Sequence, residues 1–460
     1  MSLSAGPITR RAALGVAGAA AAGYIAFGPR GGAGARVPSG RLVLDYWEKW
    51  TGHEGRAMER VVEEFNQSQD KLWVRYLVTG TIHQKALIAI AGGAVPDIIG
   101  LNAYNVPTYA KAGAVVALDE LARPHGLKLD DYAPGMRSVM TFGGTWWATV
   151  NTGGTLALYW NKAIFRECAD ELRRRGLDPE RAPATIEELE RAHEVISVIR
   201  PDGTLARAGH LHMEPGWWSW IWGYHFGGSL YDKAGNISLC DSVQNIAAYE
   251  WMQRTSAGGG VAQVERLRSG FGPYGTERSA FLTGEVAMVI QGPWIANEIA
   301  ARRRNLDYGV APFPVAQAVY DSDRPVALVD TDVLMIPTGS RHPEASMEFI
   351  AFTQQQRIVE QLATAHCKGS PMAAVSEGFL ASHPNRGVRL HTQLASSPRA
   401  FTSPATPAWA EWKDLFDSQM GRMWRHEVGV KEKLAEIAQR SQAMLDRERA
   451  TEQRRAGARA

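Results

Sequence analysis

The feature that most constrains the fold is an alternation of strand-like and helix-like segments between residues 41 and 101. Residues 41–47 and 72–78 are rich in apolar and β-prone side chains, and residues 96–101 form a shorter apolar run. The segments between them repeat apolar side chains at helical spacing: Met58, Val61, Val62 and Phe65, then Ile82, Ala86, Leu87 and Ile90. This strand–helix–strand–helix–strand order predicts a parallel sheet covered by helices, as in α/β proteins.

The carboxyl ends of the three predicted strands are candidate binding positions, because ligands of open parallel sheets bind beyond those ends. The residues at these ends are polar or aromatic: Trp47 and Glu48, Thr79, and Asn102 and Tyr104. We therefore expect these side chains to lie near a ligand.

The chain of 460 residues is long for a single hydrophobic core, because single cores stop growing at about 250–300 residues. The α/β character recurs as strands at 156–160 and 326–336, a helix opened by a capping box at Thr185, a helix at 343–356 and an amphipathic helix from Val430. Residues 447–460 are mostly charged or small, and we expect them to fray. The sequence therefore predicts two lobes.

Residues 1–35 have the pattern of an export signal. Arg10 and Arg11 precede an uncharged, Ala- and Gly-rich run that ends at Phe27, and residues 33–35 (Ala-Gly-Ala) fit a cleavage site. The run is short for a membrane span, which needs about 20 strongly apolar residues, although an uncleaved anchor is the alternative. The paired arginines indicate the twin-arginine route and a periplasmic, soluble mature protein.

The small net charge and the lack of common catalytic and metal-binding motifs argue against several classes of function. The net charge is +2, and without residues 1–35 the chain has 47 basic and 48 acidic residues. The chain therefore has no large positive charge that would attract nucleic acid. The sequence has no P-loop and no H-E-x-x-H, C-x-x-C or G-x-S-x-G motif, and His210 and His212 lack a nearby third ligand. We expect no cofactor and no metal. A glycosidase stays open at this point, because its paired carboxylates have no general local signature.

The three cysteines, Cys168, Cys240 and Cys367, are far apart in the sequence. One disulfide is compatible with that number, but small buried hydrophobic side chains are the favoured interpretation.

Tryptophan is the most abundant aromatic residue, with 15 copies against 13 each of Tyr and Phe. Several follow Gly or Pro, where loops are expected: Trp217 and Trp218, Trp294, and Trp409 and Trp412. Indole rings on loops can stack on the apolar faces of sugar rings. Sugar hydroxyls also need donors and acceptors, and the candidates are Glu48, His83, Asn102, Asn151, Asp330 and Asp332. The alternative is a Trp-rich core, at least for Trp218, Trp220 and Trp222.

An ordered series of short motifs gives the chain a family resemblance over about residues 41–445. The chain resembles the extracellular solute-binding proteins of ABC importers, the large maltose-binding-protein-like class. The motifs are Val95-Pro96-Asp97-Ile98-Ile99, Tyr109-Ala110-Lys111-Ala112-Gly113, Val116-Ala117-Leu118-Asp119, Leu158-Tyr159-Trp160-Asn161-Lys162 with Phe165, residues 280–288, Gly292-Pro293-Trp294, residues 308–314 and residues 342–350. Each motif is weak alone, and their order makes the match specific.

The resemblance implies a periplasmic-binding-protein type II fold: two α/β lobes joined by a multi-strand hinge, with a ligand cleft between them. The implied crossovers lie at residues 150–154, 326–332 and 369–374. Lobe 1 would then contain residues 41–150 and 327–370, and lobe 2 residues 151–326 and 371–446. The resemblance also implies a binding protein and not an enzyme, monomeric, which delivers a carbohydrate to a membrane permease.

Carried over by position, the resemblance implies that Trp294 stacks on sugar. It gives a similar role to Trp217 or Trp218 and to Trp409 or Trp412, and contacts to Asn102 or Tyr104. The chain departs from the family at the second crossover, where Asp330-Thr331-Asp332 replaces small Gly-rich residues. A carboxylate there can bind sugar hydroxyls, or it can favour an amino-sugar, a polyamine or another cation. A glycerol phosphate or phosphodiester is less favoured, because the expected cleft loops have no Arg cluster and Lys368 is a weak substitute.

Overall fold

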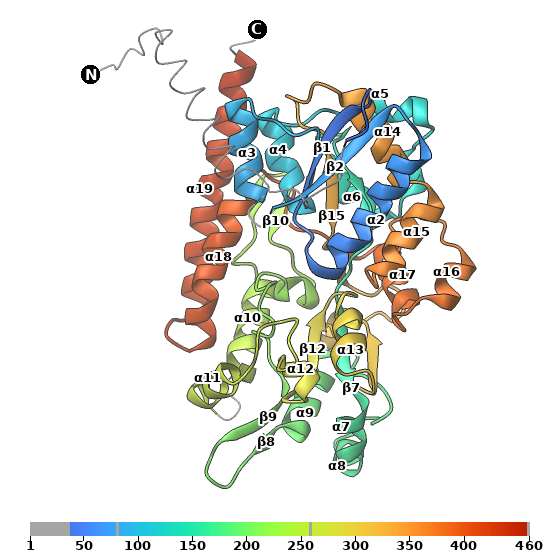
Figure 1. Cartoon of the computed structure of the whole chain (residues 1–460). Helices are drawn as coiled ribbons and strands as arrows, with labels where there is room; N and C mark the ends of the chain where they lie inside the picture. The colour runs from blue at the N-terminus through green and yellow to red at the C-terminus, as the bar shows by residue number, and fades with distance from the viewer. Residues whose placement is uncertain (1–36, 80–81, 257–259, 458–460) are drawn as a thin grey trace.

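The computed structural model describes residues 37–79, 82–256 and 260–457. The predicted export signal lies outside the described residues, and so does the side chain of His83. Two five-stranded sheets organise the described chain. Figure 1 shows β1, β2 and β15 of the first sheet in the upper part of the view and β7, β9 and β12 of the second sheet below. We call the parts built on these sheets lobe 1 and lobe 2.

The lobe 1 sheet has the strand order β2-β1-β3-β15-β6. Its strands are β1 (Leu42–Glu48), β2 (Leu72–Val78), β3 (Ile98–Asn102), β15 (Asp332–Met335) and β6 (Thr149–Val150). Strands β2 and β3 both pair in parallel with β1, as the sequence pattern predicts. Strand β15 pairs antiparallel with β3 and β6, so a distant part of the chain completes the sheet.

Amphipathic helices cover this sheet. The predicted stripe on α2 (Gly52–Ser68) is buried at Met58, Val61, Val62 and Phe65, and α2 packs on β2. The other lobe 1 helices are α3 (Ile82–Gly92), α4 (Val106–Ala112), α5 (Asp119–Ala122), α6 (Pro134–Met140), α14 (Pro343–Thr353) and α15 (Gln356–Ala365). The short hairpin β4 (Thr141–Phe142) and β5 (Thr145–Trp146) precedes β6.

The lobe 2 sheet has the order β13-β7-β12-β9-β8. Its strands are β13 (Tyr308–Ala311), β7 (Ala157–Asn161), β12 (Val286–Gln291), β9 (Leu205–His210) and β8 (Val198–Ile199). Helix α9 (Ile186–Ile196) packs on β9 and begins at the predicted cap, where Thr185 accepts a bond from the Glu188 backbone N–H. The remaining lobe 2 helices before residue 303 are α7 (Lys162–Glu167), α8 (Ala169–Arg174), α10 (Val243–Ser256), α11 (Val261–Ser269), α12 (Ala280–Thr283) and α13 (Ile295–Arg302).

The C-terminal segment packs against lobe 2 through α18 (Trp409–Trp424) and α19 (Val430–Gly457). Residues 447–457, expected to fray, continue helix α19. Two ion pairs hold this end of the helix: Arg447 with Glu411 of α18, and Glu452 with Lys111 of α4 in lobe 1. Figure 1 shows α18 and α19, in red, along one side of the molecule. Helices α16 (Glu377–Ser382) and α17 (Val388–Ser396) precede them.

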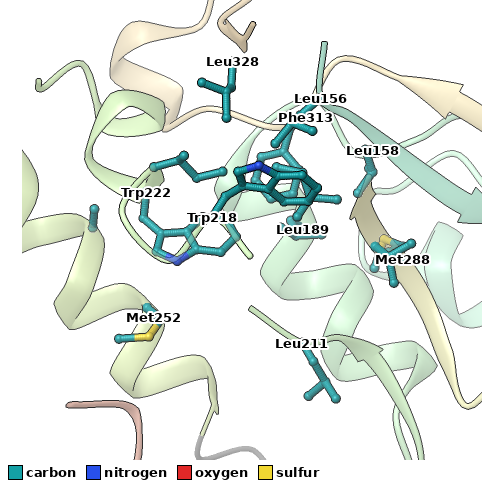
Figure 2. Close-up of a cluster of buried hydrophobic side chains, with 14 of the residues drawn as sticks. Leu156, Leu158, Leu189, Leu211, Trp218, Trp222, Met252, Met288, Phe313 and Leu328 are labelled. Atoms are coloured by element: carbon teal, nitrogen blue, oxygen red, sulfur yellow. The ribbon is translucent and has the colours of Figure 1, made fainter. Parts of the chain in front are cut away.

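Each lobe has its own hydrophobic core, and both cores draw on separated parts of the chain. The lobe 1 core takes residues from 44–150 and again from 329–395, whereas the lobe 2 core takes residues from 156–328 and 394–445. Figure 2 shows Trp218 and Trp222 among leucine, methionine and phenylalanine side chains of the lobe 2 core. The lobes are therefore interleaved along the sequence.

The chain segments that cross between the lobes lie against one another. Gly153 forms a bridge with Gly369 and Thr155 with Val329, and the Asp330 backbone N–H donates to the Gly154 carbonyl at 3.1 Å. A Cβ on Gly154 would lie 2.1 Å from the Asp330 carbonyl oxygen, so this approach requires glycine. These contacts form the hinge between the two cores.

The structure corrects one predicted element and shows whether the cysteines form a disulfide. The single strand expected at 326–336 is two strands: β14 (Ala327–Leu328) pairs with β16 (Ala400–Phe401), and β15 joins the lobe 1 sheet. All three cysteines are free, and Cys240 and Cys367 are buried. Among the described residues, no helix combines the length and apolar character needed to cross a bilayer.

Candidate ligand-binding site

A cavity of about 410 Å³ is lined by residues of both lobes and of the crossovers. One set of lining residues is charged or amide-bearing, and we call it the polar wall: Lys49, Glu54, Asn102, Asp332 and Lys368. A second set is aromatic, and we call it the aromatic wall: Trp217, Trp218, Trp220, Tyr274, Trp294 and Trp409. Asp330 lies at the second crossover and also lines the cavity.

Asp332 is the centre of the polar wall. Its Oδ1 lies 2.7 Å from Lys49 Nζ and accepts a bond from Asn102 Nδ2 at 3.1 Å. Its Oδ2 accepts a bond from Trp50 Nε1 at 2.8 Å. Lys368 Nζ lies 3.8 Å from the same oxygen and 2.9 Å from Glu54 Oε1. Two carboxylates and two ammonium groups thus neutralise one another in this wall.

The backbone explains why these residues meet. Asp332 is the first residue of β15 and stands opposite Asn102, the last residue of β3. Lys49 follows the end of β1, Glu54 lies in the first turn of α2, and Lys368 lies beside the third crossover. The carboxyl ends of two parallel strands therefore contribute to the wall, as expected for this sheet type.

The ion pairs fix the charged forms of these groups. Burial opposes ionisation of Asp332, but Lys49 and Lys368 outweigh it and lower the Asp332 pKa to about 2. Burial likewise opposes ionisation of Glu54, and Lys368 nevertheless holds the Glu54 pKa below its usual value. For Lys49, Asp332 overcomes the effect of burial and raises the pKa. Asp332, Glu54 and Lys49 are therefore ionised at neutral pH.

Trp294 owes its position to the Gly292-Pro293 turn after β12. Its ring folds back over Gly292, where a Cβ would lie 2.2 Å from the indole, so only glycine fits. Its Nε1–H donates to Gln291 Oε1 at 3.0 Å. The Trp294 polar end is therefore engaged by the protein, whereas its ring lines the cavity.

The other rings of the aromatic wall pack around Trp294. Trp218 lies 6.1 Å from it between ring centroids, at an angle of 38°, and donates its Nε1–H to Asp330 Oδ2 at 2.6 Å. Trp217 is 41% exposed and packs edge-on against Tyr274 at 4.9 Å. The ring centroids of Trp220 and Trp409 are 4.9 Å apart, and both side chains extend from the lobe 2 core to the cavity.

Comparison with known families identifies this two-lobed arrangement. A sequence profile described as "Bacterial extracellular solute-binding protein" matches residues 49–355, which is more than half of the chain. This chain belongs to the bacterial extracellular solute-binding protein family. The expected type II binding-protein fold is confirmed.

Two relatives by sequence and one solved structure show which proteins this solute-binding protein is similar to. A maltotriose-binding protein of Pyrococcus abyssi is 20% identical over 72% of this chain, and the match spans 66% of that relative, just under two thirds. The sn-glycerol-3-phosphate-binding periplasmic protein UgpB of Rhizobium meliloti is 23% identical over 77% of this chain and 82% of its own. The solved structure of CpMnBP1 with mannobiose bound has a TM-score of 0.74 at 22% identity, covering 88% of this chain and all of that one.

The cavity of this solute-binding protein contains nine of the predicted site residues. They are Asn102, Tyr104, Trp217, Trp218, Trp294, Asp330, Asp332, Lys368 and Trp409. Their presence in one cavity makes them candidates for ligand contact, and the contact itself remains a prediction.

Five other predicted residues do not line this cavity. Trp47 and Trp412 are 5% and 0% exposed and belong to the lobe 1 and lobe 2 cores, respectively. Thr79 is buried and accepts a bond from Lys85 at 3.3 Å. Asn151 is buried, and its Oδ1 accepts a bond from Gln354 at 2.6 Å.

Glu48 is the fifth of these residues and lies behind the polar wall. Its side chain is fully buried and accepts bonds from Tyr46 Oη at 2.6 Å and from the Lys49 backbone N–H at 2.7 Å. Burial raises the Glu48 pKa to about 7, although Lys49 and the Tyr46 bond act in the opposite direction. Its side chain therefore belongs to the interior and not to the cavity surface.

Sequence reasoning missed several cavity residues. Lys49 stood in the predicted strand-end segment, so its position was a usable signal. Glu54, Tyr274, Glu298 and Lys413 had no comparable signal, because none of them belongs to a motif or to a predicted strand end. Within the described part of the chain, no group of three His, Cys, Asp or Glu side chains is placed to hold a metal ion.

Proposed function

We propose that this protein is the substrate-binding component of an ABC importer and that it binds a carbohydrate in the cavity between its lobes. The ligand stacks on the aromatic wall, and its hydroxyls bond to the polar wall. It is released unchanged to a membrane permease, so the protein is not an enzyme. The protein acts as a monomer.

The observation that carries this proposal is the pairing of two chemically different walls in one cavity. Trp218 and Trp294 have their N–H groups bonded to Asp330 and Gln291, so what each ring can offer a ligand is mainly its apolar face. Sugars have apolar C–H faces and a rim of hydroxyls, and such hydroxyls can both donate and accept. The names of the mannobiose- and maltotriose-binding relatives support the same ligand class.

Lobe closure is the expected response to ligand. The two cores meet through the bonded crossovers, and the two walls come from different lobes, so a ligand that contacts both walls favours the closed state. A ligand shifts this equilibrium only by its difference in affinity for the two states. The closed form would present both lobes to the permease.

The N-terminal sequence supports export by the twin-arginine route. Arg10 and Arg11 stand before an uncharged run, and the Ala-Gly-Ala triplet at 33–35 offers a cleavage site. The mature protein is then periplasmic.

A phosphate-bearing ligand such as glycerol 3-phosphate is the second candidate, because Lys49 and Lys368 line the cavity and UgpB is a relative. Both ammonium groups already contact carboxylates of the polar wall. A phosphate would compete with Asp332 and Glu54 for these cations, which makes the carbohydrate the better fit.

A ligand panel tests the proposal on the mature protein. Mannobiose, maltotriose and sn-glycerol 3-phosphate are compared by thermal unfolding and calorimetry, with turnover of aryl glycosides measured in parallel. We expect a neutral oligosaccharide to raise the unfolding temperature, because ligand at about 100 times Kd stabilises the native state by roughly 2.7 kcal/mol. Stabilisation by the phosphate ester alone, or glycoside turnover, would contradict the proposal.

A further inference from the structure

Asp330 is a carboxylate at the junction of the hinge and the cavity. It lies between β14 and β15, its side chain is half-buried, and its backbone is fixed by the bond to Gly154. Its Oδ2 accepts the Trp218 Nε1–H at 2.6 Å. The side chain is therefore held in place at the cavity before any ligand binds.

Asp330 differs from the other acids that line the cavity. Asp332 pairs with Lys49, Glu54 pairs with Lys368, and Glu298 pairs with Arg302 at 2.9 Å. Asp330 forms no ion pair with any residue in the described part of the chain. The nearby Lys413 is engaged by Asp417 at 2.5 Å. Among the described residues, Asp330 is thus the one acid of the cavity without a cation in direct ion-pair contact.

Two indole rings lie near Asp330. Trp218 is bonded to it, and the crossover at Gly154 brings the backbone of Asp330 and the ring of Trp294 together, since a Cβ on Gly154 would lie 3.5 Å from that ring. Lys368 Nζ lies 5.6 Å from the Trp294 ring centroid, so this ring already contacts one cation. Indole faces attract ammonium groups within about 6 Å.

We propose that Asp330 and the rings of Trp218 and Trp294 form a subsite for a protonated amino group, so that the protein binds an amino sugar in preference to its neutral counterpart. The inference rests on the proposed function, because it takes the ligand to be a carbohydrate. It names the position where the ligand carries its positive charge.

The physical reason is the cost of a partly buried carboxylate that has no ion-pair partner. Burial raises the pKa of Asp330, and the Trp218 bond and the more distant charges of Lys49 and Lys368 only partly offset that effect. A sugar hydroxyl could donate to the same oxygen atoms but would leave the charge uncompensated. An ammonium group supplies both the hydrogen bond and the opposite charge, and hydrogen bonds to charged groups contribute more than neutral ones.

Three disaccharides of similar size test the inference: mannobiose, the glucosamine disaccharide with free amino groups, and its N-acetylated counterpart. Their dissociation constants are measured calorimetrically at neutral pH for the wild type and for Asp330→Asn. We expect the free amine to bind wild type about tenfold or more tighter than the N-acetylated sugar. Asp330→Asn should reduce that preference to about twofold or less.

Asp330→Asn is a gentle change, because an amide oxygen can still accept the Trp218 bond. Its unfolding temperature without ligand checks the fold. The matched control is Asp414→Asn, which removes one exposed carboxylate from α18 beside Lys413 and should keep the full preference for the amine.

Binding of mannobiose together with equal affinities for the free and N-acetylated sugars would overturn the inference and leave the proposed function standing. Retention of the amine preference in Asp330→Asn would also overturn it. Failure of every saccharide in the panel to bind would contradict the proposed function itself.

Discussion

The polar groups of the two walls of the cavity have different kinds of partners. In the polar wall, Asp332 binds two ammonium groups, an indole N–H and an amide, so the charged groups satisfy one another without ligand. In the aromatic wall, the N–H groups of Trp218 and Trp294 bond to acceptors outside the set of rings.

This difference predicts that the two walls contribute to different properties of the protein. A network whose members are all paired is rigid, and it discriminates among ligands by the position of their donors and acceptors. Indole faces contribute contact area with little directional demand. We therefore expect changes in the polar wall to affect stability first and changes in the aromatic wall to affect affinity first.

The largest effect is expected from Asp332→Ala. The change leaves Lys49 without its 2.7 Å partner and removes a contact from Lys368, whose side chain is only 7% exposed. Removing one partner of a buried ion pair typically costs about 3–5 kcal/mol. We expect the free energy of unfolding in urea to fall by that amount.

The matched control is Asp307→Ala, which breaks an exposed pair with Arg166. Exposed pairs contribute little to stability because solvent screens them, so the loss should be much smaller than for Asp332→Ala. Equal losses in the two variants would mean that the polar wall is not a stability element.

A second prediction concerns Glu48, which lies behind the polar wall. Burial raises its pKa from the ordinary value of 4.5 to about 7, so between these values the folded protein keeps a proton that the unfolded chain releases. Stability is therefore lost as the pH rises between these two values. One pKa unit corresponds to about 1.4 kcal/mol, so the effect is on the order of 3 kcal/mol.

The measurement is the free energy of unfolding of wild type and Glu48→Gln between pH 4.5 and 7.5. Buried histidines such as His366 and His391, whose pKa values are lowered to about 3, act in the opposite direction in both proteins, so the difference between the proteins isolates Glu48. We expect the free energy of unfolding of Glu48→Gln to increase relative to that of wild type as the pH rises. Glu63→Gln, at an exposed position of α2, is the control for the substitution itself. A difference between Glu48→Gln and wild type that does not change with pH would refute the assignment.

The fold was largely predictable because its elements depend on local periodicity. The run from β1 to β3 follows directly from spacing, since each helix buries one stripe against its own sheet. The segment at 326–336 was not predictable in the same way. Its apolar residues are β-prone throughout, but those before Asp330 pair with β16 and those after it join lobe 1. Local sequence does not specify which sheet a residue enters.

The cavity was predictable in part, and the errors have a common cause. Strand ends identified Asn102 but also Trp47, which is buried because β1 is covered on both faces at its carboxyl end, where Tyr46 and Glu48 are buried as well. On α18, Trp409 lines the cavity from the first residue of the helix, whereas Trp412 lies one turn further into the core. The ion pair between Lys49 and Asp332 joins residues far apart in the chain, so spacing could not reveal it.

The smallest expected effect concerns the aromatic wall. Trp294→Ala removes a ring that lines the cavity and is only partly buried at the edge of the lobe 2 core, so the fold should survive. Truncation of a stacked aromatic typically costs about 1–3 kcal/mol of binding, roughly 5- to 150-fold in Kd. Trp294→Phe keeps a ring but lacks the N–H that bonds Gln291, and we expect it to lose less.

Trp73→Ala provides the comparison. Trp73 is a half-buried ring on β2 that contacts Arg41 and does not line the cavity, so its loss should leave carbohydrate affinity unchanged. If Trp294→Ala bound ligand as tightly as Trp73→Ala, the aromatic wall would not be the surface on which the ligand stacks. If Trp294→Ala instead unfolded as readily as Asp332→Ala, the two walls would not differ in the way proposed, because both would then serve stability before binding.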